Sequence, residues 1–270
     1  MLQVFSYGGG VQSTAALVLA AQGKISYHTF LFCNVGGDSE NPETLIYVRD
    51  VAMPYAQAHG MDLIELQRTW QMGERSGQPV TLYGQLTKVG SKTIGIPIRM
   101  SNGAPGNRSC TADFKIGVVA RWLREHGATK DNPAIVALGI SLDEFQRMHS
   151  DSGIAYEKLA YPLIDLRLDR SACTRIISDA GLPVPPKSSC WFCPYHSLRV
   201  WQAMRNKQPE LFTKAVALEQ YINERRTALG KDQVWLTDKL KPLDQATTEY
   251  EQGNLFEETE DTCESGYCMV

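Results

Sequence analysis

The sequence predicts an α/β protein with a doubly wound parallel sheet and a helical subdomain toward its C-terminal end. Three observations support this class. A short apolar stretch at 4–7 leads through a glycine-rich turn into an apolar, helix-forming stretch at 11–20. Buried-strand patterns at 29–35 and 61–66 flank a helical pattern, which is the order expected of parallel strands joined by helical crossovers. Apolar residues recur at helical spacing in 198–229.

The remaining elements follow from local signals. A helix is expected over 41–58, because Pro42 suits the first helical turn and Glu43 complements the helix dipole there. Residues 134–140 form the next buried strand pattern, and ligands of open α/β sheets bind beyond the C-terminal ends of such strands. Residues 70–108 are rich in Gly, Ser, Thr and Gln, which predicts a long surface loop or a lid.

Composition narrows the class of protein. The chain of 270 residues is 43% hydrophobic and can bury a substantial core. It contains no run of 18 apolar residues, so we expect no membrane span, and no basic-then-apolar signal segment opens it. We therefore expect a cytoplasmic protein, whose seven cysteines are more often metal-binding or catalytic than disulfide-bonded.

Three regions are expected along the chain: an α/β domain at 1–186, a cysteine-containing helical region at 187–245 and an acidic tail at 246–270. The net charge of −3 conceals an asymmetry between the last two. Residues 187–245 hold ten Lys or Arg against six Asp or Glu, whereas 246–270 hold seven acids and no base. The excess of basic residues in 187–245 can bind a polyanion, but basic residues on a solvent-exposed helical surface are the commoner explanation.

The glycine-rich turn predicts a phosphate site. Gly8, Gly9 and Gly10 have no β-carbon, so their backbone amides can approach an anion closely, and the helix start behind them adds its positive dipole end. Ser13 and Thr14 are expected at the cap, where a hydroxyl serves the helix or a phosphate oxygen. A purely structural strand-to-helix turn is the alternative. The Walker A loop is excluded, because no Gly-Lys-Ser/Thr follows.

The turn resembles the nucleotide loop of the adenine nucleotide alpha-hydrolase superfamily, the PP-loop enzymes. Their usual form is Ser-Gly-Gly-x-Asp-Ser, and the aligned residues here are Gly8-Gly9-Gly10-Val11-Gln12-Ser13. With Gln12 at the acidic position, the loop looks more like that of the phosphoadenylyl-sulfate (PAPS) reductase branch. That branch binds a ready-made adenylyl sulfate, whereas other PP-loop enzymes cleave ATP with magnesium. The resemblance thus implies an adenine nucleotide as ligand, either ATP or adenylyl sulfate.

Other segments carry the same resemblance in family order. Asn34-Val35-Gly36 followed by Pro42-Glu43-Thr44 resembles the Asp-Thr-Gly and Pro-Glu-Thr signature of the reductases, with Asn34 in the place of an acid that positions adenosine. The run that contains Gly139, Asp143 and Arg147 is also similar. The nucleotide-binding residues expected on this basis are Ser6, Gly8, Gly9, Gly10, Gln12, Ser13, Asn34, Gly36 and Gly139.

Two residues at the end of the 134–140 strand are expected to take part in catalysis. Asp143 can orient ribose hydroxyls or a cation, and capping a helix is its equally common role. Arg147 can pair with a phosphate or sulfate through its planar guanidinium.

The cysteine pattern carries the strongest chemical signal. Cys190 and Cys193, spaced as Cys-x-x-Cys, can present two thiolates to one metal, and a redox pair is the competing hypothesis. Iron–sulfur adenylyl-sulfate reductases carry a Cys-Cys pair at a similar interval before such a motif and bind a [4Fe-4S] cluster. Here Ser109 replaces the first of that pair, which leaves Cys110.

Three thiolates leave one iron open to substrate or to a fourth ligand, for which His196, Cys173 and a tail cysteine are candidates. An open iron is what PP-loop thiolation enzymes use. Zn²⁺ held by Cys110, Cys190, Cys193 and His196 is the alternative, as is a metal-free protein. In the tail, Cys263 and Cys268 resemble the nucleophilic tail thiol of the reductases, which implies a catalytic role for them. The alternative is a tail whose cysteines take no part in the chemistry.

These patterns lead to three functional hypotheses. The first is an iron–sulfur-dependent enzyme that transfers sulfur to an adenylated acceptor or reduces an adenylyl sulfate, with a sulfur donor protein as a candidate partner. The second is a nucleotide-binding module with reduced catalysis and a structural zinc. The third is a nucleic-acid-modifying, thiolating enzyme, which requires the basic residues of 187–245 to form one patch beside the site.

Overall fold

The computed structural model describes residues 1–253, so the predicted tail residues Cys263 and Cys268 lie outside the described part. The described residues form two compact units. Unit 1 comprises residues 1–80 and 111–189, and unit 2 comprises residues 81–110 and 190–253. This division differs from the predicted one, because 81–110 joins the C-terminal helices instead of the sheet domain. The helix α11 (Leu243–Gly253) also occupies the start of the predicted acidic tail.

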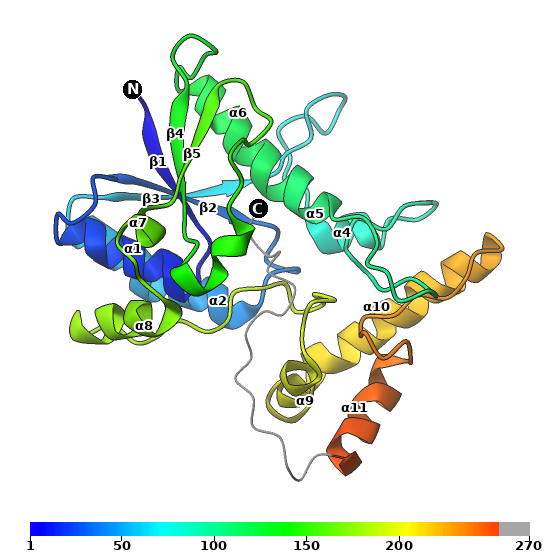
Figure 1. Cartoon of the computed structure of the whole chain (residues 1–270). Coiled ribbons are helices and arrows are strands. Elements are labelled where there is room, and N and C mark those ends of the chain that lie inside the picture. Colours follow the sequence, from blue (N-terminus) through cyan, green and yellow to red (C-terminus); the bar gives the residue numbers. More distant parts are fainter. Residues whose placement is uncertain (254–270) are drawn as a thin grey trace. The chain divides into compact units, whose positions relative to one another are not determined.

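Unit 1 is built on an all-parallel sheet of five strands in the order β3-β2-β1-β4-β5 (Figure 1). The strands are β1 (Gln3–Tyr7), β2 (Thr29–Asn34), β3 (Asp62–Gln67), β4 (Ala134–Leu138) and β5 (Glu157–Ala160). The predicted parallel α/β class is confirmed. The edge strand β5 was not predicted, because it is only four residues long and includes Glu157 and Lys158.

Helices cover both faces of the sheet. Phe5 and Tyr7 of β1 point to one face, where they pack with α1 (Val11–Ala21), α8 (Arg170–Asp179) and the 42–58 helical segment. Val4 points to the other face, toward α6 (Gly117–Glu125). This alternation follows from the two-residue period of a strand. Full burial of each large apolar side chain stabilises the fold by about 1.5–3 kcal/mol.

The predicted 41–58 helix forms as three joined segments, α2 (Pro42–Tyr47), η1 (Val48–Ala52) and α3 (Met53–Ala58). Asn41 caps it, since its Oδ1 accepts a hydrogen bond from Glu43 N at 3.0 Å. The middle segment is a π-helix, and Pro54 follows it. Proline lacks the N–H of a regular helical turn, so a wider turn before it accommodates the missing hydrogen bond.

Short helices connect the later strands of unit 1. The chain passes through α5 (Ser109–Thr111) and η2 (Ala112–Ile116) into α6, and the link from β4 to β5 contains η3 (Leu142–Arg147). The helix α7 (Pro162–Asp165) follows β5 and precedes α8. Because η3 begins four residues after β4 ends, it lies at the C-terminal edge of the sheet, where ligands of this fold class bind.

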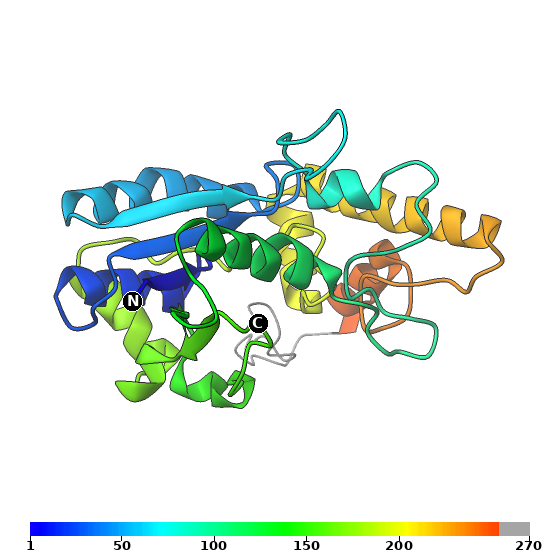
Figure 2. The same ribbon diagram turned by 90° about the horizontal axis from the view of Figure 1, so that it is seen from above.

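Unit 2 is helical, with α4 (Leu82–Leu86), α9 (Leu198–Lys207), α10 (Pro209–Ala228) and α11. The predicted helical C-terminal region is present, and its helix interface buries Trp201 and Ile222. The end of α4 lies beside α10 in both views (Figures 1 and 2). Arg225 of α10 donates a hydrogen bond to Leu86 O at 2.8 Å, which fixes this contact. None of the helices in residues 1–253 combines the length and apolar composition needed to span a membrane.

A buried glutamate ties α10 to the chain that follows it. Glu219 Oε1 accepts a hydrogen bond from Leu236 N at 2.7 Å, and its Oε2 accepts one from Leu243 N at 2.8 Å. The side chain is 3% exposed, and this burial raises its pKa to about 7. One carboxyl group therefore satisfies two buried backbone donors that the loop and the start of α11 would otherwise leave unpaired.

Replacing Glu219 with Gln is expected to lower the free energy of unfolding at pH 5 by about 1–2 kcal/mol, because the amide NH₂ cannot accept from the second backbone N–H. The loss should shrink at pH 8. Because the pKa of Glu219 is higher in the folded protein, its contribution to the free energy of unfolding decreases as the pH rises from about 4.5 to 7. Gln does not titrate, so the variant shows no such decrease. Urea unfolding at both pH values measures this. Glu224→Gln, on the exposed side of α10, is the control, and equal effects of the two variants would contradict the assignment.

Candidate functional site

The glycine turn forms the strand-to-helix loop between β1 and α1. Gly9 has φ +76°, and a Cβ on it would lie 2.9 Å from Thr44 Cγ2. Gly10 has an extended backbone and stands at the N-cap of α1, so no side chain covers the helix start from that position. Backbone N–H groups and the positive helix end thus remain available to an anion.

Ser13 and Thr14 are not the cap residues, so that prediction was wrong. The helix begins at Val11, which places the two hydroxyl residues third and fourth in α1. Ser13 Oγ donates a hydrogen bond to Gly10 O at 3.0 Å, and Thr14 Oγ1 lies 2.9 Å from the Tyr7 hydroxyl. Both hydroxyls brace the loop from within, and Thr14 is fully buried.

Gly139 brings the end of β4 against the same loop. A Cβ on Gly139 would lie 3.2 Å from Ser13 N and 3.5 Å from Gln12 C. A side chain at this position would push the strand end away from the start of α1. The structure therefore places Gly139 beside the loop through backbone packing, and its predicted role in nucleotide binding stays a prediction.

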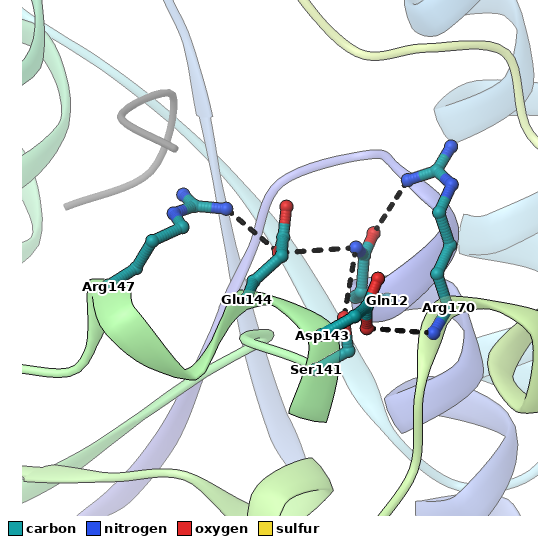
Figure 3. Close-up of polar contacts among 6 residues, drawn as sticks. All are labelled: Gln12, Ser141, Asp143, Glu144, Arg147 and Arg170. Atoms are coloured by element: carbon teal, nitrogen blue, oxygen red, sulfur yellow. Dashed lines mark hydrogen bonds and ion pairs between the residues drawn. The ribbon is translucent and has the colours of Figure 1, made fainter. Parts of the chain in front are cut away.

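The side-chain amide of Gln12 joins three elements (Figure 3). Its Nε2 lies 3.3 Å from both Ser141 Oγ and Glu144 Oε2, to which it donates hydrogen bonds. Its Oε1 accepts one from Arg170 Nη1, also at 3.3 Å. Both ends of the neutral Gln12 amide are therefore engaged by protein groups.

Arg147 is a buried cation with spare hydrogen-bonding capacity. Its Nη1 forms an ion pair with Glu144 Oε2 at 2.9 Å, and the residue is 9% exposed. Its Nε and Nη2 are buried and have no hydrogen-bond partner among the described residues. Unpaired donors on a buried guanidinium are costly, and an oxyanion would satisfy them. Because Glu144 also accepts from Gln12, Arg147 is linked to the glycine loop through two side chains (Figure 3).

Asp143 uses one carboxylate oxygen in the protein. Its Oδ1 accepts a hydrogen bond from Arg170 N at 3.0 Å, at the first residue of α8. Asp169, the N-cap of α8, accepts from Ala172 N at 2.6 Å. Asp143 thus supports the start of α8, a different helix from its own, and its predicted catalytic role stays a prediction.

Asn34 and Gly36 shape the turn after β2. Asn34 Oδ1 accepts a hydrogen bond from Gly36 N at 2.8 Å, and its Nδ2 donates to Glu65 Oε1 at 2.8 Å. Gly36 has φ +126°, which favours glycine. Since both polar ends of Asn34 have protein partners, its direct contribution to adenosine binding stays a prediction.

A cavity of about 280 Å³ opens on the α6 face of the sheet. Ser6 of β1 lines it, two residues before Gly8, so the cavity reaches the strand that carries the glycine loop. Its polar lining includes Lys115, His149 and Glu157, and burial raises the pKa of Glu157 to about 7. The apolar part consists of Ile116, Val119, Val136, Leu138 and Leu159.

Sequence reasoning missed this cavity apart from Ser6. Its lining comes from three strands, from the α5, η2 and α6 segments and from the 148–156 loop, and no local pattern connects those segments. Glu157 lines the cavity from the edge strand β5. Because the sequence pattern did not reveal this strand, the charged residue could not be recognised as part of a site.

Two further buried oxygens lie on the segment that covers the glycine loop. Thr44, whose methyl group faces Gly9, is fully buried, and its Oγ1 has no hydrogen-bond partner among the described residues. Glu40 is 2% exposed, its Oε1 is likewise unpartnered, and burial raises its pKa while Lys115 opposes that shift.

Unit 2 holds the predicted metal ligands. Cys193 N donates to Cys190 O at 3.1 Å, and His196 N donates to Cys193 O at 3.1 Å, so the motif forms two successive tight turns. Cys110 belongs to the same unit, and its N–H donates to Gly95 O at 2.7 Å. Within residues 1–253, however, no three His, Cys, Asp or Glu side chains are grouped as a metal site. The turn supplies two cysteine side chains, and the described residues do not complete a zinc or cluster site.

Cys173, one of the candidates for a fourth ligand, belongs to the core of unit 1 instead. It is fully buried on α8, and burial raises its thiol pKa to about 12. A thiol of this kind stays protonated and acts as a small apolar side chain, so Cys173 is removed from the ligand candidates.

Comparison with known proteins found similar solved structures only. No family model and no curated protein matches the chain. A PAPS reductase from Candida auris, in complex with phosphate, has a TM-score of 0.42 and 15% identity, over 68% of this chain and 75% of that one. The U34-tRNA thiolase NcsA from Methanococcus maripaludis, with its [4Fe-4S] cluster, has a TM-score of 0.43 and 13% identity, over 82% of this chain and 72% of that one.

Gly9→Ala is expected to disrupt the loop, whereas Gly10→Ala is tolerated. The added Cβ at Gly9 meets Thr44 in a left-handed conformation, while the nearest atom to a Cβ at Gly10 is Ser188 Cβ at 3.8 Å. Gly9→Ala should lower the free energy of unfolding by about 1–3 kcal/mol, and Gly10→Ala by less than about 1 kcal/mol. Urea unfolding of the pair tests this, and similar losses would show that the loop lacks the described geometry.

Proposed function

We propose that unit 1 binds an adenine nucleotide and that the protein is an enzyme of sulfur chemistry. The reaction would be transfer of sulfur to an adenylated acceptor or reduction of an adenylyl sulfate. The observation that carries the nucleotide-binding part is Arg147, a buried guanidinium with two unpartnered N–H groups, linked to the glycine loop through Glu144 and Gln12.

The phosphate or sulfate end of the ligand would lie at the glycine loop. The N-terminal N–H groups of α1 donate to it, and the helix dipole favours its negative charge. Arg147 adds charge-assisted hydrogen bonds, which are about twice as strong as neutral ones. Glu144 holds Arg147 at 2.9 Å, so the guanidinium is positioned before the ligand arrives.

The nucleoside end would enter the cavity beside Ser6. Its volume of about 280 Å³ is adequate for a purine, and its apolar side chains suit the faces of an aromatic ring. Lys115 and Glu157 supply polar groups for the ring edge. Because the pKa of Glu157 is raised to about 7, its carboxyl can still donate a hydrogen bond near neutral pH.

Gln12 favours a ligand that is already activated. Most PP-loop enzymes have an acid at this position, whereas the Gln12 carbonyl oxygen here accepts from Arg170. A neutral amide with both ends engaged is a poor ligand for Mg²⁺, which prefers carboxylate oxygens. Adenylyl sulfate or another adenylylated compound is therefore the preferred ligand, with ATP as the alternative.

The sulfur chemistry rests on the cysteine pattern of unit 2. Cys190 and Cys193 share one turn, which supports a two-thiolate contribution. The [4Fe-4S] cluster is proposed from the sequence pattern, with Cys110 as third ligand and further cysteines outside the described residues. Since residues 1–253 do not complete that site, no step is assigned to a cluster.

A second candidate function is a nucleotide-binding module with a structural zinc. The hydrogen bonds of the Gln12 amide favour this candidate, because an amide that already binds Ser141, Glu144 and Arg170 would not hold the Mg²⁺ that cleavage of ATP requires. Turnover of an adenylyl sulfate or of ATP would remove this candidate.

Arg147→Gln is expected to weaken binding of adenylyl sulfate by about 10- to 100-fold, because a buried charge-assisted interaction contributes about 1.5–3 kcal/mol. Isothermal titration calorimetry measures this. Arg49→Gln is the matched control in unit 1, since Arg49 is exposed and pairs only with Asp50 among the described residues. Unchanged affinity in Arg147→Gln would overturn the proposed binding site.

Anaerobic purification followed by iron, sulfide and zinc analysis tests the sulfur chemistry. About four irons with matching sulfide per chain are expected for a [4Fe-4S] cluster, with loss of both in a variant whose Cys110, Cys190 and Cys193 are changed to Ser. One zinc without iron would favour the second candidate. Normal turnover by the triple variant would contradict cysteine-dependent chemistry altogether.

A further inference from the structure

Unit 2 contains a pair of arginines on one aromatic ring. The guanidinium carbons of Arg99 and Arg108 lie 5.7 Å and 5.8 Å from the centroid of the Tyr195 ring. Both distances are within the range of a cation–π contact. Both guanidinium groups thus contact one ring, which follows the Cys190–Cys193 turn in the sequence.

The backbone around the pair is well anchored. Arg99 N donates to Trp235 O at 2.8 Å, and Trp235 N donates back to Arg99 O at 2.9 Å. Arg99 also forms an isolated bridge with Pro105. Tyr195 lies inside the turn closed by the hydrogen bond from His196 N to Cys193 O. The backbone that carries Arg99 and the backbone that carries Tyr195 are therefore both held by hydrogen bonds.

Negative charge is scarce in this part of the chain. The segment 81–110, which carries both arginines, contains four basic residues and no acidic one. Residues 81–110 and 190–253 together hold 13 Lys or Arg and 8 Asp or Glu, a balance of +5. Arg99 forms no ion pair with any described residue, and its buried Nε has no hydrogen-bond partner there.

We propose that Arg99 and Arg108, held on Tyr195, form a binding site for a tetrahedral oxyanion, the phosphate or sulfate group of a ligand. The buried Nε–H of Arg99 has no acceptor among the described residues, and an oxyanion bound there supplies one. Planar guanidinium groups match the oxygens of phosphate and sulfate in pairs. This site shares no residue with the glycine loop, and it does not depend on the function proposed for unit 1.

The site gives unit 2 a role in recognising anionic ligands. Arg108 precedes Cys110 by two residues, and Tyr195 follows Cys193 by two. An anion bound here would be held next to the cysteine-containing turn of the same unit. Its source is a nucleotide or other small phosphate ester, or the backbone of a nucleic acid.

The experiment follows the Arg99 Nε–H signal by ¹⁵N NMR of the full chain, titrated with inorganic phosphate and sulfate at constant ionic strength. Loss of the signal in Arg99→Lys assigns it. We expect a saturable shift, and about tenfold weaker binding in Arg108→Gln. Lys92→Gln, an exposed residue of the same segment, should bind as the unaltered protein does. No saturable shift, or equal affinity in Arg108→Gln and Lys92→Gln, would overturn the site.

A second arm separates the sources of the phosphate group. AMP and a fluorescent 12-nucleotide RNA are each titrated against the unaltered protein, Arg99→Gln and Lys92→Gln. If Arg99→Gln weakens binding of the RNA but not of AMP, the ligand is a nucleic-acid backbone. If it weakens binding of AMP but not of the RNA, the ligand is a small phosphate ester. Because Arg147 is unchanged in these variants, failure here leaves the nucleotide site of unit 1 intact, and failure of Arg147→Gln leaves this site intact.

Discussion

The candidate site of unit 1 depends on the three hydrogen bonds of the Gln12 amide. They connect the start of α1 to Ser141, to Glu144 of η3 and to Arg170 of α8. Each bond is long, but all three act on one planar group, so the amide cannot turn without losing several together. The glycine loop, the link after β4 and the start of α8 are thereby held in one arrangement at the C-terminal edge of the sheet.

The same arrangement explains why a buried arginine is tolerated. Arg147 has one ion-pair partner, Glu144, and Glu144 is itself held by Gln12. Burial of a cation with unpaired donors opposes folding, so the site stores a cost that an oxyanion can remove. Gln12 is neutral, so it holds Glu144 in place without adding a charge of its own. Glu144 and Asp143 lie beside Arg147 and Arg170 at this edge. What suits the site to an anionic ligand is therefore the two N–H groups of Arg147 that have no hydrogen-bond partner among the described residues.

Several features of the site could be predicted from local sequence. The glycine triplet before an apolar helix indicated the loop, and its position after a short apolar strand indicated the edge of the sheet. Other features could not. Ser13 and Thr14 looked like cap residues, but the helix starts at Val11 and Gly10 takes the cap. The acceptor role of Asp143 at α8 joins residues 27 positions apart, and such a contact leaves no local pattern.

The sequence by itself determined the order of the first four strands, the parallel sheet and the glycine loop, because these depend on the period of apolar residues and on the lack of a β-carbon. Tertiary structure decided which polar groups meet. It paired Gln12 with Arg170, placed Glu157 in a cavity and brought Arg99 and Arg108 to one tyrosine ring. These contacts join distant parts of the chain, and only the packing of whole elements sets their geometry.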